Sequence, residues 1–265
     1  MIVGFIGDIV GKPGREMIKE HLFALREEFL LDLVIANGEN ASHGFGVSCK
    51  NANELFSYGI DCITGGNHIW DKKDIVLHLE TLPIVRPLNY PDGVPGVGVR
   101  IINSLAIINL MGHFTMPMVS NPFIAIKEEV KRLKNRGVRD IFIDFHAEAT
   151  SEKNALFVFL KGEVSAICGT HTHIGTDDMV VDNGTFYVSD VGLTGCRDAV
   201  IGMDTKAPLK RFLTGLPAPH DIPKKCKKIL QMVILEIKDG RCLGAKKVKI
   251  YDDRDGKIIQ KAFVE

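Results

Sequence analysis

The chain has no excess of charge of either sign. Its 265 residues include 33 basic and 33 acidic side chains, which give a formal net charge of +0. A balanced charge does not mark the whole surface for nucleic acid or for an anionic membrane. The one dense basic stretch, residues 224–228, is more typical of a solvated approach to the next strand than of a binding patch. The sequence therefore predicts neither a membrane partner nor a nucleic-acid partner.

Long hydrophobic runs, tandem repeats, low-complexity stretches and linkers are also missing. The apolar start, Met1–Gly7, meets Asp8 at once and is too short for a signal peptide core or a membrane span. A composition of 45% hydrophobic and 25% charged residues is ordinary for a globular protein. We therefore expect a single domain over residues 1–265, located in the cytoplasm, with a core of its own.

Paired cysteine motifs are the third absence. The six cysteines are scattered, with no CxxC among them, at positions 49, 62, 168, 196, 226 and 242. This spacing excludes zinc-finger chemistry. It also fits reduced thiols in a cytoplasm better than a disulfide framework, so we expect six free thiols.

What the chain does contain is an alternation of short apolar strands and amphipathic helices. Strands are predicted at Ile2–Gly7, Leu33–Ala36, Cys62–Thr64, Ile141–Phe145 and Val164–Cys168, with a hairpin of Val99–Asn103 and Leu105–Leu110. Helices are predicted from Pro13 to about Leu30, from the capping residue Ser48 to Gly59, and over Ile69–Leu82 and Phe123–Lys134. The strands are continuous apolar runs, which indicates that both of their faces are covered.

The second half favours antiparallel pairing. Asp182-Asn183-Gly184 and Lys238-Asp239-Gly240 are hairpin turn signals between β-rich runs. The predicted fold class is therefore α/β, with a core of two β-sheets flanked by helices in an α/β/β/α sandwich.

The most informative pattern is a set of polar clusters that follow five of the predicted strands. The clusters are Gly7-Asp8, Asn37-Gly38-Glu39-Asn40, Gly65-Gly66-Asn67-His68, Asp144-Phe145-His146 and Gly169-Thr170-His171-Thr172-His173. Ligands of open α/β sheets bind beyond the carboxyl ends of the strands, where all five clusters are expected. Residues two apart on an extended chain share a face, so His171 and His173 would point the same way.

Carboxylate, amide and imidazole groups together suit manganese, iron or zinc better than calcium. Two such ions about 3.5–4 Å apart need roughly this many ligands, with one carboxylate to bridge them. A lone Gly-Asp is usually a turn and a lone Asn-His a loop, but five coincidences at strand ends favour a metal centre. Four further histidines match no such motif and are assigned structural positions: His21, His78, His113 and His220. The stretch Gly7–Lys12 is one residue too short between its glycines for a phosphate loop, and Pro13 replaces the required hydroxyl.

These motifs resemble those of the calcineurin-like metallophosphoesterases. The general pattern of that superfamily has a histidine where this chain has Val10 and an aspartate where it has Glu39. Both departures are shared by one branch, the YmdB-like bacterial phosphodiesterases. The resemblance to this branch extends over essentially the whole chain and is carried by residues 38–44, 66–73, 143–153 and 201–204.

The resemblance implies a ligand set and a catalytic residue. One metal would take Asp8, Glu39, Asn40 and His173, and a second would take Glu39, Asn67, His146 and His171, with Glu39 as the bridge. His68 would be the general acid. The branch is described as di-iron or di-manganese hydrolases of cyclic nucleotides, including the 2′,3′ type, and zinc is a further candidate.

A phosphodiesterase mechanism also follows from the residues themselves. Two divalent ions outweigh the charges of Asp8 and Glu39, so the site would attract an anionic phosphodiester and activate a water to attack phosphorus. His68 neighbours the predicted ligand Asn67 and would protonate the leaving oxygen. His43, Glu148 and Thr150 would orient substrate or ligands.

Two alternatives stay open. A phosphomonoesterase or 5′-nucleotidase could use the same bimetallic core, and a regulatory protein with little activity could keep the metals as a structural staple. The expected partner is a small phosphodiester or cyclic nucleotide, and self-association into a homo-oligomer is compatible with the sequence.

Overall fold

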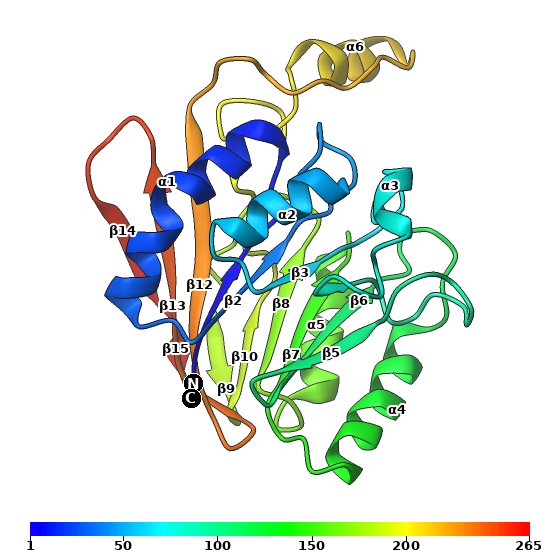
Figure 1. Cartoon of the computed structure of the whole chain (residues 1–265), viewed down its shortest axis with the longest axis vertical. Helices are drawn as coiled ribbons and strands as arrows, with labels where there is room; N and C mark the ends of the chain where they lie inside the picture. The colour runs from blue at the N-terminus through cyan, green and yellow to red at the C-terminus, as the bar shows by residue number, and fades with distance from the viewer.

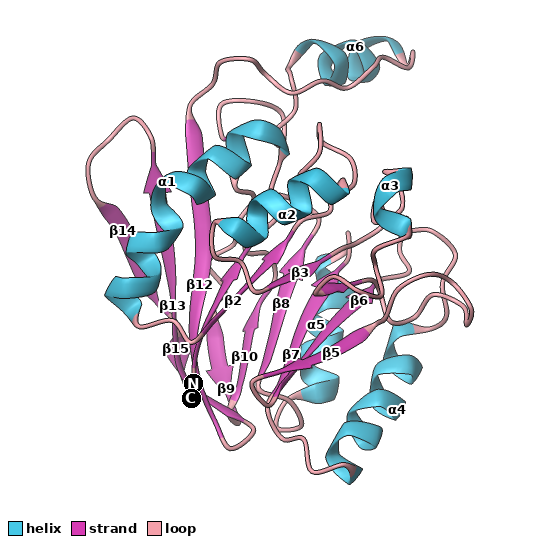
Figure 2. Ribbon diagram, viewed as in Figure 1, coloured by secondary structure: helices cyan, strands magenta, loops and turns pink.

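The computed structural model describes residues 1–265 and contains two β-sheets packed face to face between layers of helices (Figures 1 and 2). The eight-stranded sheet has the order β14-β13-β12-β1-β2-β3-β4, with β11 paired to β12, and the seven-stranded sheet has the order β15-β9-β10-β8-β7-β6-β5. The strands of the first sheet are β1 (Ile2–Ile6), β2 (Leu33–Asn37), β3 (Cys62–Thr64), β4 (Ile84–Val85), β11 (Gly195–Cys196), β12 (Lys228–Lys238), β13 (Arg241–Tyr251) and β14 (Lys257–Lys261). Those of the second are β5 (Val99–Ile102), β6 (Leu105–Met111), β7 (Ile141–His146), β8 (Ala166–Thr170), β9 (Val180–Asp182), β10 (Thr185–Val188) and β15 (Phe263–Val264).

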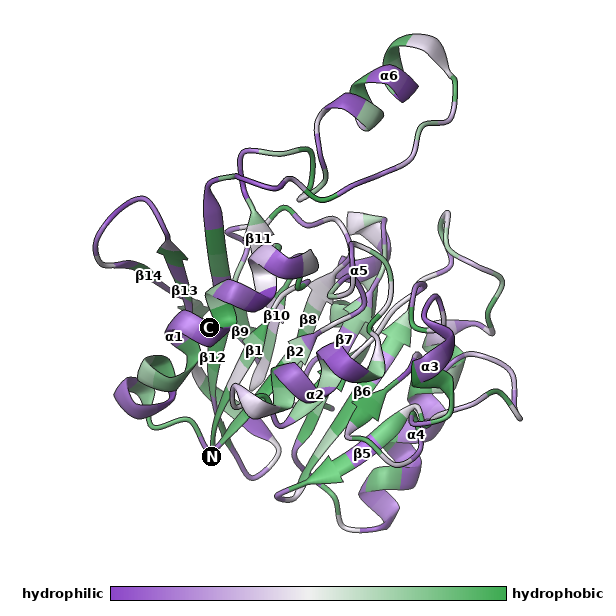
Figure 3. Ribbon diagram, turned by 45° about the horizontal axis from the view of Figure 1, so that its top comes forward, coloured by the Kyte–Doolittle hydropathy of each residue, from purple (hydrophilic) through white to green (hydrophobic).

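Helices cover the outer face of each sheet and complete the predicted α/β/β/α sandwich. Helices α1 (Gly11–Phe29) and α2 (Cys49–Ser57) lie over the first sheet, and α4 (Pro122–Asn135) and α5 (Thr150–Leu160) lie over the second. The short α3 (Lys73–Val76) and the helix α6 (Lys206–Thr214) complete the set, and α6 stands clear of both sheets (Figure 3). None of the six helices combines the length and the hydrophobicity that a membrane-spanning segment requires.

The continuous apolar character of the strands is explained by this layering. Along β1, Val3 and Phe5 point into the core between the two sheets, whereas Ile6 packs against the helices. The inter-sheet core is dense, and the rings of Phe5 and Phe142 meet edge to face with centroids 4.9 Å apart. The two sheets are thereby held in a fixed relation, which places the carboxyl ends of β1, β2, β3, β7 and β8 at one edge.

Most predicted elements are confirmed, including both hairpins at 182–184 and 238–240. The side chain of Ser48 accepts a hydrogen bond from the Asn51 amide at the start of α2, as a capping residue should. The prediction for Ile69–Leu82 is wrong, because only Lys73–Val76 is helical there. The Arg100 guanidinium donates to the carbonyls of Leu79 and Glu80, so that a distant side chain replaces the missing helical hydrogen bonds. Helices α5 and α6 were not predicted.

The prediction of six free thiols is also wrong. Cys196 and Cys226 form a disulfide, whereas Cys49, Cys62, Cys168 and Cys242 are free. The two bonded cysteines are 30 residues apart in sequence, but β11 and the start of β12 pair and bring their Cα atoms to 5.6 Å. Location in the cytoplasm therefore stays a prediction that the cysteines do not support.

Candidate metal centre

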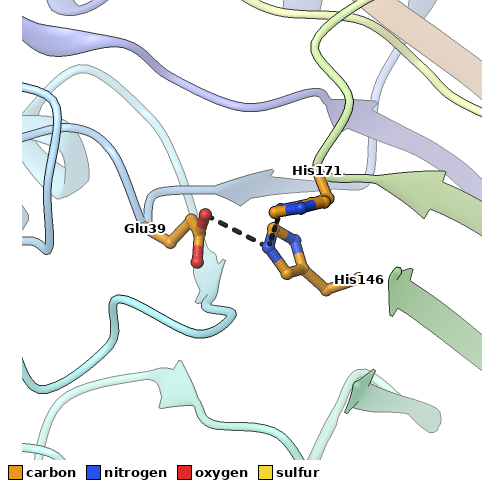
Figure 4. Close-up of side chains that lie close together, drawn as sticks. All are labelled: Glu39, His146 and His171. Atoms are coloured by element: carbon orange, nitrogen blue, oxygen red, sulfur yellow. Dashed lines mark hydrogen bonds and ion pairs between the residues drawn. The ribbon is translucent and has the colours of Figure 1, made fainter. Parts of the chain in front are cut away.

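The predicted ligands converge at the shared edge of the two sheets. Each follows or ends a strand: Asp8 after β1, Glu39 and Asn40 after β2, Asn67 after β3, His146 at the end of β7, and His171 and His173 after β8. Parallel strands bring their carboxyl ends together, which explains how residues more than 160 positions apart become neighbours. Three of these side chains, Glu39, His146 and His171, are shown together in Figure 4.

Three side-chain atoms crowd around Nε2 of His146. The Oε1 atom of Glu39, the Oδ1 atom of Asn67 and the Nδ1 atom of His171 each lie 3.1 Å from it. One ring nitrogen carries at most one hydrogen, so it cannot satisfy all three neighbours by donation. The donor atoms of Glu39, His146 and His171 all lie within 4.8 Å of one another.

The tautomer of His146 points its lone pair into this group. Its Nδ1 lies 2.9 Å from Oγ1 of Thr170, and that hydroxyl donates its own hydrogen to Asp144 Oδ1 at 2.7 Å. Nδ1 of His146 must therefore donate to Thr170, which leaves Nε2 as an acceptor in the neutral ring. Lone pairs of oxygen and nitrogen facing one another at 3.1 Å are the arrangement that a cation would stabilise.

The Asp144 carboxylate accepts the hydrogen bond from Thr170 and lies behind the candidate ligands. Burial raises the pKa of its carboxyl to about 6, against the lowering effect of His146 and the hydroxyls of Thr170 and Thr64, so that it is mainly ionised at neutral pH. It also accepts a hydrogen bond from the Asn37 amide. Asp144 and Asn37, which belong to the predicted clusters, thus hold the ligands in place from behind.

A second group of donors lies beside the first. Oδ1 of Asp8 is 3.8 Å from Nε2 of His173, and Nδ2 of Asn40 lies 3.5 Å from the same nitrogen and 3.4 Å from Oε1 of Glu39. Oδ1 of Asp8 and Oδ1 of Asn40 are buried without a hydrogen-bond partner. Such atoms are costly unless a cation or water meets them. A half-turn of the Asn40 amide would exchange its oxygen and nitrogen and present the oxygen to the same space.

The two groups share Glu39. Its Oε1 lies near His146 in one group and Asn40 in the other, while Oε2 accepts the backbone N–H of His68. Gly66 is necessary for this approach, because a Cβ at that position would lie 2.1 Å from Oε2 of Glu39 and 2.5 Å from the His146 ring. The residues present therefore fit a metal centre with one shared carboxylate.

The pKa shifts of these side chains in the metal-free protein also indicate a cation site. Burial raises the pKa of Asp8, although His173 and His146 oppose the shift. Burial disfavours charge on Glu39 and His146 too, but their mutual attraction prevails and places the pKa of Glu39 at about 2 and that of His146 at about 9. Burial and the charge of His146 lower the pKa of His171 to about 3, which keeps that imidazole neutral. Without a cation, a proton on His146 takes over part of its role.

The backbone conformation that brings His171 and His173 to the site differs from the prediction. Strand β8 ends at Thr170, and the two histidines follow with φ angles of 98° and 67°, in the left-handed region. They do not share the face of an extended strand. The strained backbone is held by hydrogen bonds, since Asp8 accepts the His171 amide and Nδ1 of His173 lies 2.7 Å from the Ile201 carbonyl.

His68 lies beside the ligands without joining them. Its Nδ1 is 2.8 Å from Oδ2 of Asp71, and its ring packs edge to face on Phe45 with centroids 5.0 Å apart. Asp71 can therefore orient the ring and leave Nε2 for substrate. No role was predicted for Asp71, although its position three residues after His68 in the Gly66–Lys73 motif is a signal that could have indicated one.

The three residues predicted to orient substrate are placed differently from one another. Oε2 of Glu148 lies 3.1 Å from Nε2 of His171, so this carboxylate contacts a candidate ligand. Thr150 is the exposed first residue of α5, and His43 lines a separate basic pocket with Lys12 and Lys224. His220, assigned a structural position from the sequence, instead lines the pocket above the metal centre.

Residues 5–248 match the family model described as YmdB-like protein. The chain belongs to the YmdB-like family. It is similar to the 2′,3′-cyclic-nucleotide 2′-phosphodiesterase of Bacillus subtilis (strain 168), with 42% identity over 261 aligned residues; the alignment covers 96% of this chain and 98% of the relative. The resemblance found in the sequence motifs is thereby confirmed.

Two solved structures have the same fold as this chain. A crystal structure described as a novel phosphatase, from Mycoplasma pneumoniae, superposes with a TM-score of 0.89 at 32% identity and covers 99% of this chain and 94% of its own. The NAD nucleotidase of Haemophilus influenzae has a TM-score of 0.55 at 14% identity, covering 99% of this chain and 56% of its own. The second likeness concerns the fold alone.

Proposed function

We propose that this YmdB-like protein is a phosphodiesterase that binds two divalent transition-metal ions and hydrolyses 2′,3′-cyclic nucleotides. The observation that carries the proposal is the pair of adjacent donor groups that share Glu39, with His68 beside them and outside both. A purely structural metal site would need the donors but would not need a free imidazole next to them. The name of the Bacillus subtilis relative supports the choice of substrate class.

The proposed ligands follow the two groups. One ion would be held by Asp8, Glu39, Asn40 and His173, and the other by Glu39, Asn67, His146 and His171. The mixture of carboxylate, amide and imidazole favours iron or manganese, with zinc as a further candidate. When bound, the ions would lower the pKa of a water and offset the charge of the phosphate.

The chain's own residues supply the rest of the chemistry. His68 donates a proton from Nε2 to the leaving alkoxide, because Nδ1 is engaged by Asp71. Phe45 fixes the plane of the His68 ring, and the Glu39 carboxylate holds its backbone. Glu148 positions His171 from the rim of the site.

Metal content and turnover of one variant test the proposal together. Purified protein should contain two ions per chain and hydrolyse a 2′,3′-cyclic nucleotide. Glu39→Ala should lose both ions and reduce activity by several orders of magnitude, because Glu39 belongs to both donor groups. Glu80→Ala, which changes an exposed glutamate remote from the site, is the matched control. Two ions bound by Glu39→Ala as tightly as by the wild type would contradict the ligand assignment.

A phosphomonoesterase is the second candidate, favoured by the description of the Mycoplasma pneumoniae structure as a phosphatase. A diester carries one negative charge and has a substituent on each side of phosphorus, whereas a terminal monoester carries about two charges and one substituent. A diesterase should therefore show higher kcat/KM on 2′,3′-cyclic and nitrophenyl diesters than on nucleoside monophosphates. The reverse ranking would favour the nucleotidase, and metal-replete protein without turnover would favour the regulatory alternative. Activity on 3′,5′-cyclic nucleotides belongs to the same comparison.

A further inference from the structure

A pocket of about 740 Å³ opens above the candidate metal centre and is larger than a phosphate group requires. Metal-centre residues Glu39, Asn40, His171 and His173 form one part of it. Much of the rest comes from the segment 197–225 between the two disulfide-bonded cysteines, which we name the cap. The lining residues of the cap are Val200, Ile201, Met203, Pro208, Arg211, Phe212 and His220. The ligand roles proposed above account for none of them.

The base of the cap is tied to the metal centre. The Ile201 carbonyl lies 2.7 Å from Nδ1 of His173, and Met203 is buried against the loop after β2, where a Cβ on Gly44 would come within 2.7 Å of its methyl group. A hydrogen bond from the Asp204 amide to the Asp221 carbonyl joins the two arms of the cap. The cap therefore holds a definite position over the pocket, although α6 projects from the body (Figure 3).

Aromatic rings face the pocket from two separate segments. Phe212 of α6 lines it while 82% exposed, and half-buried Phe45, from the loop after β2, lies against the His68 ring. The His220 ring of the cap lies 6.2 Å from that of Phe45. An exposed phenylalanine beside a polar metal centre has no role in the core, but a flat ring next to the reacting phosphate can stack on a base.

The positive charge of the pocket also comes from the cap. Arg211 is the pocket's one lysine or arginine, and the side chain makes no ion pair or hydrogen bond within the protein. A free guanidinium suits a phosphate oxygen or a base edge. The pocket volume lies within the 300–1,000 Å³ range of small-molecule sites, so a nucleoside fits beside the phosphate.

We propose that the cap, together with Phe45, forms the nucleobase subsite of this enzyme, with Phe212 as its principal stacking surface. The inference rests on the proposed function, because the phosphate must lie at the metal centre for the base to reach the cap. It adds to that function the inference that the enzyme recognises the nucleoside of its substrate as well as the phosphodiester.

Two substrates that differ only in the nucleoside test the inference. Phe212→Ala is compared with wild type on 2′,3′-cyclic AMP and on ethylene phosphate, a five-membered cyclic diester without a base. The loss of kcat/KM on the nucleotide should exceed the loss on ethylene phosphate by about 5- to 150-fold, the usual worth of one base–aromatic stack. Phe45→Leu should shift the ratio in the same direction.

Leu213→Ala is the matched control, because Leu213 is also 82% exposed on α6 but does not line the pocket. It should leave the ratio of the two substrates unchanged. Equal losses on both substrates in Phe212→Ala, or an equal change of ratio in Leu213→Ala, would overturn the subsite and leave the proposed function intact. If the metal-replete wild type hydrolyses neither of the two substrates, the proposed function itself is overturned.

Discussion

At the scale of single residues, the site depends on which nitrogen of each histidine ring carries the hydrogen. Thr170 takes the one hydrogen of neutral His146 on Nδ1, and Nε2 is left facing Glu39, Asn67 and His171. A hydrogen bond made behind the site thereby decides the chemistry in front of it. The same logic applies to His68, whose Nδ1 is held by Asp71.

The role of His68 can be separated from that of a ligand by comparing leaving groups. His68→Ala should retain both metals and lose about 10²–10⁴-fold in turnover of a 2′,3′-cyclic nucleotide, since its alkoxide needs a proton. The loss on bis-p-nitrophenyl phosphate should be much smaller, because nitrophenolate leaves without one. His78→Ala, which changes a histidine outside the pocket, is the control. Equal losses on both substrates with metal retained would reduce His68 to a positioning group.

Metal binding should release a proton. With no metal present, the pKa of His146 is about 9, above its ordinary value of 6.5, so its ring is protonated at pH 7.5. A metal needs Nε2 unprotonated, and therefore displaces about one proton per chain at this pH. Affinity should rise with pH up to about 9 and then level off. Titration calorimetry in two buffers of different ionisation enthalpy measures the release, and identical heats in both would contradict the prediction.

At the scale of elements, the cap is a segment whose two ends are joined by a disulfide. The disulfide joins residues 30 positions apart at the points where the cap leaves β11 and returns to β12. The link limits the freedom of the unfolded chain, and it also keeps Ile201 near His173 in the folded state.

Removal of the disulfide should therefore lower the stability of the folded protein. Cys196→Ser with Cys226→Ser should lower the free energy of unfolding by about 2–4 kcal/mol, the usual effect of closing a loop of this length. Thermal unfolding with and without reductant measures it: the wild type should lose stability in reductant and the double variant should not. Cys49→Ser, which changes a free cysteine, is the control. A wild type insensitive to reductant would show that the link contributes nothing.

At the scale of the whole molecule, the candidate metal centre joins the two sheets. Asp8, Glu39 and Asn67 follow strands of the eight-stranded sheet, and His146, His171 and His173 end or follow strands of the other. Ions bound between them would add cross-links to an interface otherwise held by apolar packing such as Phe5 on Phe142.

Bound metal should accordingly stabilise the fold. Metal at 100 times its dissociation constant adds about 2.7 kcal/mol per site, which raises the melting temperature in proportion to the logarithm of the metal concentration. Differential scanning calorimetry of chelator-treated protein with increasing Mn²⁺ measures the shift. Glu39→Ala should show almost none of it. An equal shift in this variant would mean that the metal acts elsewhere.

The sequence by itself determined the strands that lead into the site, three of the six helices and the residues that follow those strands. These depend on local causes: short apolar runs, capping residues such as Ser48, and turn residues such as Asn183-Gly184. The strand-end rule then placed Asp8, Glu39 and His146 near one another without any knowledge of the fold.

Only the tertiary structure decided the features that depend on residues far apart in the chain. The Arg100 contacts that replace a helix at 79–80, the Cys196–Cys226 link and the Thr170 hydrogen bond to His146 each join separate segments. The same is true of Phe212 and His220, which belong to no motif and reach the pocket because the cap is anchored above the metal centre. Local periodicity carries no information on such contacts, since their partners are chosen by the packing of the two sheets.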